Sequence, residues 1–443
     1  MKILILDPIP NVQHRISKDT SGGYGTGNDF GEGFVSKYLK KKLKKIHDWP
    51  PLFAAYTFSV LKEKGNEVTY ASSIPNNISN YDLCILTSSI VCCETECMQL
   101  KKITSLGIKC FVIGPFASNN PEKYLEFGGI VVSGEPEFYF IKDIDFKKIE
   151  KSTVVKFETE HTLDDLPYPD WPALMINKKA STLFDGVGSN KSIPILGTRG
   201  CPFSCFKYCV YPLQQGRKVR QRDPKKIVDE IYYWKKNYGF NMFIFRDPVF
   251  SINRKHTIEF SNELIKRNIK IKFIIETHLK ILDTELIQIL KKAGLSAVKV
   301  GIESADENVL KEANRFTVKK DEQLEKIREL EKNNILISSM FIIAFPTDSE
   351  TSIAKTLAYA KKLNTTYAQF SVWTPYPGTP IFHEYKDQII VDKYENYDQY
   401  NLVYKHKNLS KEKVRNLLSK VYSDYYLRIS WIFKYVYQSF KNI

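Results

Sequence analysis

The chain has 443 residues, which suits about three domains, and its 43% hydrophobic and 26% charged residues are ordinary for a globular protein. These values exclude an intrinsically disordered chain, a collagen-like repeat and a small disulfide-stapled scaffold. The formal net charge of +15 would suit nucleic acid, an anionic membrane or an acidic substrate, and equally the solvated surface of a lysine-rich protein.

Two features of the sequence indicate the compartment. No window of about 18 consecutive apolar residues predicts a transmembrane helix. The apolar run Lys2–Leu6 is too short for a signal peptide and predicts a first strand. We therefore expect a cytoplasmic protein, in which clustered cysteines are more often metal ligands or catalytic groups than disulfides.

Residues 1–150 alternate short apolar runs with helical segments, which predicts an α/β domain with a doubly wound, Rossmann-like parallel sheet. The expected strands are Lys2–Leu6, Glu67–Ala71, Leu83–Ser88, Lys109–Ile113 and Gly129–Val132, and the expected helices are Leu52–Lys64, Glu94–Leu106 and Pro121–Phe127. Ligands of such sheets bind outside the carboxyl ends of the strands. The candidate ligand-facing loops are therefore Asp7-Pro8, Thr87-Ser88-Ser89, the stretch Gly114–Ser118 that begins Gly114-Pro115, and Ser133–Pro136.

The glycine-rich stretch Ser21–Gly27 lacks the Lys-Ser/Thr pair of a phosphate-binding loop, so we interpret it as a flexible loop. The basic run Lys37–Lys45 predicts a solvated helix face. Prolines break regular structure at Leu166–Trp171, and we expect residues 151–190 to be a linker.

A second alternating series fills residues 191–385. Its expected strands are Ile193–Gly197, Met242–Phe245, Ile271–Glu276, Ala297–Ile302, Ser338–Ile343 and Ala368–Trp373, with helices at Lys225–Lys236, Lys255–Lys266, Thr284–Ala293 and Ser352–Lys362. Six β/α units predict a partial (β/α)6 barrel rather than a full eightfold one.

Residues 386–443 change to loops and then to a C-terminal helical segment. Tyr422–Ile443 is aromatic and basic, which suits a cap over the barrel mouth, an interfacial helix or a partner site.

Three cysteines, Cys201, Cys205 and Cys209, lie in the loop after the first expected barrel strand, where the active sites of β/α barrels are built. Thiolates are the usual ligands of iron–sulfur clusters. A structural zinc site usually has four ligands, and no fourth Cys or His lies at a suitable spacing nearby. We therefore expect the three thiols to hold a cluster and to leave one iron open for a small molecule.

This loop resembles the cysteine motif of the radical S-adenosylmethionine (SAM) superfamily, and the N-terminal part is similar to the subgroup with a cobalamin-binding domain. The resemblance implies a 4Fe–4S cluster that binds SAM and cleaves it reductively to methionine and a 5′-deoxyadenosyl radical. The family's usual spacing is Cys-x3-Cys-x2-Cys, whereas three residues separate Cys205 from Cys209. Because the family commonly has an aromatic residue before the third cysteine, as Tyr208 is here, we expect Cys209 to be the third ligand.

Polar residues at successive strand ends of a barrel converge on one pocket. From the resemblance, we expect SAM to contact Asp247, Glu276, Glu303, Ser304 and Ile343. The alternative interpretation of Asp247 and Glu303 is structural: each carboxylate would cap the helix that follows its strand. The family usually has glycine where this chain has Ala344 and Phe345.

The run Thr374–Pro380 resembles a segment common in the cobalamin-linked subgroup. The resemblance would place Thr87, Ser88, Gly114 and Pro115 beside the corrin of cobalamin. The Asp-x-His-x-x-Gly motif that supplies a cobalt ligand in some cobalamin domains is absent. The alternative is a sheet retained only for docking or for shaping the substrate site.

The expected function is radical SAM chemistry, with cobalamin-dependent methylation of an unactivated carbon. We expect a small-molecule or lipid-like substrate, a reducing partner of the flavodoxin or ferredoxin type, and peripheral membrane contact through the C-terminal segment. The alternatives are a cobalamin-independent cyclase, isomerase or oxidoreductase, and a catalytically silent cluster-bearing protein. Without a recognised nucleic-acid-binding module, we expect no nucleic acid partner.

Overall fold

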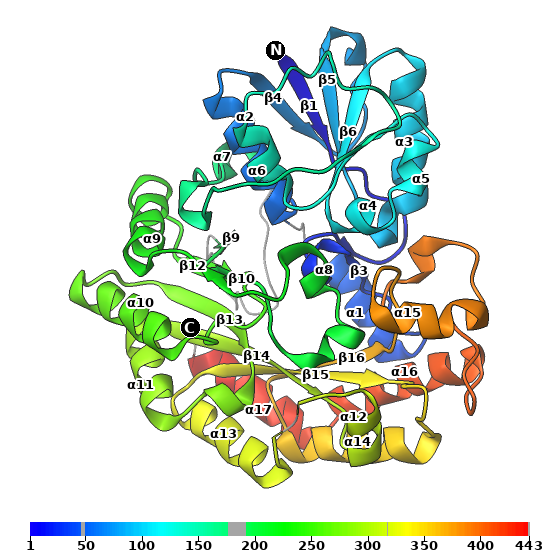
Figure 1. Cartoon of the computed structure of the whole chain (residues 1–443). Coiled ribbons are helices and arrows are strands. Elements are labelled where there is room, and N and C mark those ends of the chain that lie inside the picture. The colour runs from blue at the N-terminus through cyan, green and yellow to red at the C-terminus, as the bar shows by residue number, and fades with distance from the viewer. Residues whose placement is uncertain (46–48, 176–191, 317, 442–443) are drawn as a thin grey trace.

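The computed structural model describes residues 1–45, 49–175, 192–316 and 318–441, so much of the expected linker, residues 176–191, lies outside the described part. Two six-stranded sheets organise the chain, and Figure 1 shows the first above the second. Within the described residues, no helix combines the length and the apolarity needed to span a membrane.

The first sheet is doubly wound and parallel, which confirms the predicted fold class. Its strand order is β4-β1-β5-β6-β7-β8, with bounds β1 Lys2–Leu6, β4 Glu67–Ala71, β5 Leu83–Thr87, β6 Lys109–Ile113, β7 Ile130–Val132 and β8 Val154–Val155. Alternate residues of β1 and β5 enter two different apolar clusters, one on each face, because helices cover both sides. The strand order reverses between β1 and β5, which is where open α/β sheets bind ligands.

The helices of the first sheet are α2 Leu52–Glu63 and α6 Pro136–Ile141 on one face, and α3 Cys93–Ser105 and α5 Glu122–Leu125 on the other. The short helix α4, Pro115–Asn119, follows β6 directly. The sheet also continues past residue 150, because β8 pairs with β7 inside the segment expected to be a linker.

The second sheet is the predicted partial barrel of six parallel strands in chain order. Its strands are β9 Ser192–Ile195, β12 Met242–Phe245, β13 Lys272–Thr277, β14 Leu295–Glu303, β15 Leu336–Ile343 and β16 Tyr367–Val372. The covering helices are α9 Pro224–Tyr238, α10 Arg254–Lys266, α11 Thr284–Ala293, α12 Glu307–Glu312, α13 Lys320–Lys332 and α14 Glu350–Leu363. Helices α12 and α13 were not predicted, because their sequences are rich in charged residues.

The two faces of the barrel strands differ in exposure. Phe341 of β15 and Phe370 of β16 stack with ring centroids 5.1 Å apart and are buried. Residues of the opposite face, such as Met340 and its register partner Gln369, retain partial exposure. The inner face of the barrel is therefore solvated, as a ligand-binding face requires.

The C-terminal segment closes the open edge of the barrel. Helix α16, Lys411–Tyr426, packs on β16, on α14 and on the N-terminal helix α1, Phe34–Lys44 (Figure 1). The Tyr422 hydroxyl accepts from the Phe370 N–H at 3.0 Å and donates to the Phe370 carbonyl at 2.9 Å. Tyr426 makes the same pair of bonds to Ala368, so tyrosines satisfy the edge strand in place of a seventh strand.

The last helix, α17 Ile429–Lys441, does not cap the barrel mouth, so that interpretation of the segment is wrong. The Trp431 indole donates to the Thr366 carbonyl at 3.0 Å, and Tyr435 contacts Tyr367. Both partners lie at the amino end of β16, whereas the mouth is formed by the carboxyl ends of the strands.

Candidate functional site

The cysteine loop puts its second and third cysteines one helical turn apart. Cys205 lies in a short 3-10 helix, Ser204–Lys207, and the Cys209 N–H donates to the Cys205 carbonyl at 3.0 Å. An i,i+4 pair shares one helix face, so the extra residue in the motif closes a turn instead of displacing Cys209. Tyr208 points elsewhere and meets Phe345 edge-on with a centroid distance of 6.1 Å.

The start of the loop depends on Gly200. Residues Thr198–Arg199 (β10) pair with Arg220–Gln221 (β11), and Gly200 leaves this hairpin with φ of +93°. A Cβ atom on Gly200 would lie 2.1 Å from the Lys218 carbonyl oxygen, so only glycine fits.

An arginine absent from our sequence-based site lies beside the thiols. The Arg315 guanidinium is 3.6 Å from the Cys205 sulfur, 3.1 Å from the Glu303 carboxylate and 3.2 Å from the Gly301 carbonyl oxygen. A hydrogen bond from Cys209, together with this cation, lowers the pKa of Cys205 to about 6. At neutral pH Cys205 is therefore a thiolate, the form that ligates metals.

Two of the expected SAM-contacting residues meet on the inner face of the barrel. Glu276 and Glu303 interact electrostatically with each other, and burial raises the pKa of both carboxyls. Lys299, the register partner of Glu276, and Arg246 lower the pKa of Glu276. Glu303 has φ of +64°, a strained conformation at the register shift of β14 and β15, which is typical of functional sites.

Three other expected residues build turns. The Asp247 carboxylate accepts from the Gly197 N–H at 2.8 Å, and burial raises its pKa to about 7. The Ser304 hydroxyl lies 3.2 Å from that of Thr356 and accepts from the Asp306 N–H. Asp247 does not cap the following helix, because Asn253 is the N-cap of α10, and binding of SAM by Asp247 or Ser304 stays a prediction.

Ile343 is buried, and its carbonyl accepts from the Trp373 N–H at 2.9 Å. The next residue, Ala344, has φ of +58°, the left-handed conformation that glycine adopts without strain. This conformation accounts for the usual glycine of the family, and the Tyr404 hydroxyl secures the turn by donating to the Ala344 carbonyl at 3.0 Å. A contact of the Ile343 backbone with adenine stays a prediction.

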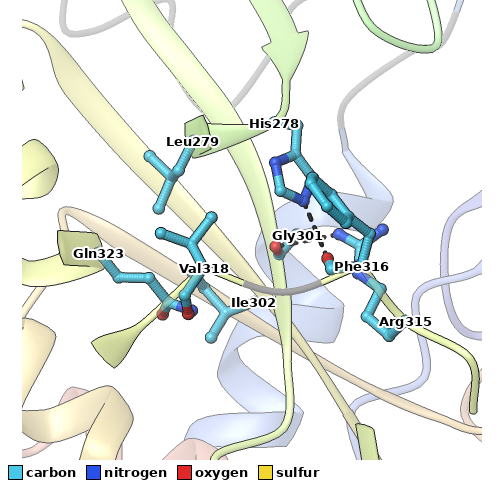
Figure 2. Close-up of a pocket in the computed structure, with 8 residues that line it drawn as sticks. All are labelled: His278, Leu279, Gly301, Ile302, Arg315, Phe316, Val318 and Gln323. Atoms are coloured by element: carbon cyan, nitrogen blue, oxygen red, sulfur yellow. Dashed lines mark hydrogen bonds between the residues drawn. The ribbon is translucent and has the colours of Figure 1, made fainter. Parts of the chain in front are cut away.

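An aromatic group seats the cysteine loop against the barrel. Phe203 of the loop stacks on Phe316 with centroids 5.8 Å apart, and His278 packs against both rings. Figure 2 shows His278 bonded to the Phe316 carbonyl, next to Arg315 and Gly301. Burial lowers the pKa of His278 to about 4, so this imidazole is neutral at physiological pH.

The reversal point of the first sheet holds a buried ion network. The Lys18 ammonium is 2.9 Å from Asp7 at the end of β1 and 2.7 Å from Glu96 of α3. It also donates to the Thr87 hydroxyl at 3.0 Å, and the Tyr124 hydroxyl donates to Glu96 at 2.6 Å. This network joins residues as distant in the chain as Asp7 and Tyr124, and it was not predicted from the sequence.

The four residues expected beside cobalamin lie together at this edge and are buried. Thr87 donates to Asp7, Ser88 accepts from the Ala117 N–H at 3.0 Å, and a Cβ on Gly114 would meet Ser88 at 2.9 Å. Other protein atoms surround these four residues, and their contact with the corrin stays a prediction.

The glycine-rich stretch covers this edge. Residues 22–27 are buried, so the interpretation of Ser21–Gly27 as a flexible loop is wrong. Gly23 packs closely on Pro115, the fourth residue expected beside the corrin, because a Cβ on Gly23 would lie 2.8 Å from the Pro115 ring. Tyr24 accepts from the Ile90 N–H at 2.9 Å and donates its hydroxyl to the Pro377 carbonyl at 3.0 Å, so the stretch joins the sheet to the barrel.

A second connection runs from the sheet to the cysteine loop. Arg199 donates to Glu135 at 2.7 Å and to Glu137, and Arg220 donates to Glu135 at 2.6 Å. Both glutamates lie just after β7, and Arg199 lies two residues before Cys201. The position of the cysteine loop therefore depends on the first sheet.

The donor set fits an iron–sulfur cluster. Cys201 and Cys205 are buried, and Cys209 is half-buried. Within the described ranges, no three His, Cys, Asp or Glu side chains group around a point where one metal ion could sit. A four-iron cluster takes each thiolate on a different iron, so its ligands need not meet at one atom.

The sequence profile of the radical SAM superfamily matches residues 195–360. An uncharacterised methyltransferase of Pyrococcus horikoshii is 24% identical over 428 residues, which cover 88% of this chain and 90% of the relative. An anaerobic magnesium-protoporphyrin IX monomethyl ester cyclase of Cereibacter sphaeroides is 33% identical over 264 residues, which cover 59% of this chain and 42% of that protein.

Among solved structures, the radical SAM methyltransferase TsrM from Kitasatospora setae, with cobalamin and a 4Fe–4S cluster bound, superposes with a TM-score of 0.59. It is 15% identical, and the match covers 87% of this chain and 74% of that chain. Together with the cysteine loop at a barrel mouth, the profile match defines the class: residues 195–360 form a radical SAM domain. The parallel sheet that precedes the barrel is part of the fold that this chain shares with TsrM.

Proposed function

We propose that this protein is a radical SAM enzyme that transfers a methyl group to an unactivated carbon with the help of cobalamin. The observation that carries the proposal is the convergence of three cysteines of one loop at the mouth of a barrel whose inner face carries Glu276 and Glu303. A cluster held by Cys201, Cys205 and Cys209 would supply the electron that splits SAM into methionine and a 5′-deoxyadenosyl radical.

The chain's own residues have separate tasks in this proposal. Cys201, Cys205 and Cys209 hold the cluster, and Arg315 places a positive charge against the thiolate of Cys205. Glu276 and Glu303 offer carboxylates to the ammonium or hydroxyl groups of a ligand on the inner face, where Lys299 offers a cation. The aromatic group of Phe203, His278 and Phe316 seats the cysteine loop against the barrel.

The cobalamin part of the proposal is supported by the order of the first sheet and by the fold shared with TsrM. The substrate is a small molecule, and the reductant is a protein of the flavodoxin or ferredoxin type. A lipid-like substrate and a cytoplasmic location remain proposals. Peripheral membrane contact remains one as well, and α17 supplies its structural basis.

Anaerobic reconstitution tests the cluster assignment. We expect about four irons per chain in the wild type and a loss of loading in Cys209→Ala. The matched control is Cys97→Ala, because Cys97 is also a free cysteine but lies on α3, on the first sheet. Loading that survives Cys209→Ala would overturn the choice of the third ligand.

Product analysis separates the proposed activity from its alternatives. Under reducing conditions with SAM, we expect 5′-deoxyadenosine, and its absence would indicate a catalytically silent protein. Cobalamin retained through desalting supports the methyltransferase, whereas turnover without cobalamin would favour the cobalamin-independent cyclase, isomerase or oxidoreductase.

A further inference from the structure

Helix α17 leaves an apolar stripe uncovered. Five of its side chains are between 44% and 72% exposed and follow the i, i+3, i+4, i+7, i+8 spacing of one helix face: Ile429, Ile432, Phe433, Val436 and Tyr437. We call this set the α17 stripe. Exposed large apolar side chains are ordinary when scattered, but a contiguous row of them indicates a surface that binds something.

The opposite face of α17 holds the helix in place. Trp431 donates to the Thr366 carbonyl, and Lys434 contacts both the Glu331 carboxylate and the Asn364 carbonyl. Trp431 and Tyr435 also stack on each other with centroids 5.0 Å apart. Because these contacts fix the rotation of the helix, the stripe points away from the barrel.

Lysines gather at the end of the barrel where α17 lies. The segment Ile429–Lys441 has no acidic residue, and the helices whose carboxyl ends lie at this end finish with lysines: Lys291 and Lys292 on α11, Lys332 on α13, and Lys361 and Lys362 on α14. Of these, Lys291 donates to the Asn334 carbonyl and Lys361 pairs with Asp424 at 3.6 Å. Glu331 and Asn364, the partners of Lys434, mark the ends of α13 and α14. Lysines at the carboxyl ends of helices also stabilise the helix dipoles, but helix dipoles do not account for the exposed side chains of the α17 stripe.

We propose that α17 docks the protein onto an anionic phospholipid bilayer. The stripe would enter the boundary between headgroups and acyl chains, and the lysines of α11, α13 and α14 would face the anionic headgroups. A second copy of this chain fits less well, because two-fold pairing through the stripe would bring the same lysines together. Since α17 lies at the amino end of the strands, the cysteine loop would face away from the membrane.

Vesicle flotation of the full chain tests this docking. We expect the wild type to float with vesicles of phosphatidylglycerol and phosphatidylcholine, to bind pure phosphatidylcholine much less, and to detach as salt rises. Ile432→Ser with Phe433→Ser should weaken binding by on the order of tenfold or more, because it removes the centre of the stripe. Lys332→Glu with Lys362→Glu should also weaken it roughly tenfold or more.

The matched control is Met98→Ser on α3, because Met98 is 64% exposed but lies on the first sheet, where we expect no effect. Thermal unfolding of each variant checks that it folds. Binding that is unchanged in the stripe variant, or absent from anionic vesicles, would overturn the proposal. If the wild type forms a dimer, the stripe variant is a monomer and neither binds vesicles, the stripe binds a second copy of this chain, and this result would also overturn the proposal.

Discussion

Arg199 joins the first sheet to the cysteine loop, and replacing it tests whether that connection stabilises the protein. The Arg199 side chain is 6% exposed, and its partners Glu137 and Glu135 are 0% and 12% exposed. In Arg199→Met, Arg220 still pairs with Glu135, but Glu137 loses the only cation within ion-pair distance of it in the described structure. Removing one partner of a buried pair costs about 3–5 kcal/mol, and we expect a loss of this size near neutral pH.

The loss should depend on pH in one direction. Burial already raises the pKa of Glu137 while Arg199 opposes the shift, so removing the arginine raises that pKa further. A carboxyl whose folded-state pKa lies above its unfolded value destabilises the protein increasingly as pH rises between the two values. The difference in stability between Arg199→Met and the wild type should therefore widen as pH rises above the folded-state pKa of Glu137 in the wild type.

Urea unfolding followed by tryptophan fluorescence measures this difference. The matched control is Arg220→Met, because that side chain is 35% exposed and Arg199 remains on Glu135, so it should cost about 1 kcal/mol or less. A loss in Arg199→Met that is no larger than the control's, or that shrinks as pH rises, would refute the reasoning.

Three further changes probe the site and its supports. Gly200→Ala should destabilise the cysteine loop and reduce iron loading, because the added Cβ would meet the Lys218 carbonyl. The control is Gly216→Ala, where φ is also positive but no atom would clash, so it should lower the unfolding free energy by only about 1–3 kcal/mol. Equal iron loading in the two variants would contradict this. Asp398→Asn should exceed the wild type in stability by about 1–2 kcal/mol near pH 5 and by about 4 kcal/mol near pH 8, because burial raises the pKa of Asp398 to about 7; chemical unfolding at both pH values decides. Tyr24→Phe removes the hydroxyl bond to the barrel and should lower the unfolding free energy by about 1 kcal/mol, and an unchanged midpoint would argue against that connection.

Much of the fold could be predicted because its signals are local. The strands β1, β4, β6 and β12 have the predicted bounds, since each is a short apolar run between polar segments. Short elements escaped prediction: β8 has two residues and α4 has five, too few for a periodic pattern. The burial of Ser21–Gly27 also escaped it, because glycines suit a mobile loop and a tightly packed one equally.

The candidate site also combines residues that could be predicted from the sequence with residues that could not. The cysteine motif was visible because its three residues lie within nine positions. Asp247 was expected at the ligand, and the structure shows that it also accepts a hydrogen bond from Gly197, 50 positions earlier, which no local pattern reveals. Arg315 gave no signal, since it follows a short helix in a segment without pattern.

By itself, the sequence determined the two α/β units, the position of the cysteine loop after the first barrel strand, and the resemblance to radical SAM proteins. Only the tertiary structure decided that Arg315 reaches Cys205 across 110 positions, that Lys18 occupies the reversal point of the first sheet, and that α17 presents its apolar stripe outward. The physical reason is range: periodicity and motifs report contacts within a few residues, whereas buried ion pairs and uncovered faces depend on which distant elements pack together.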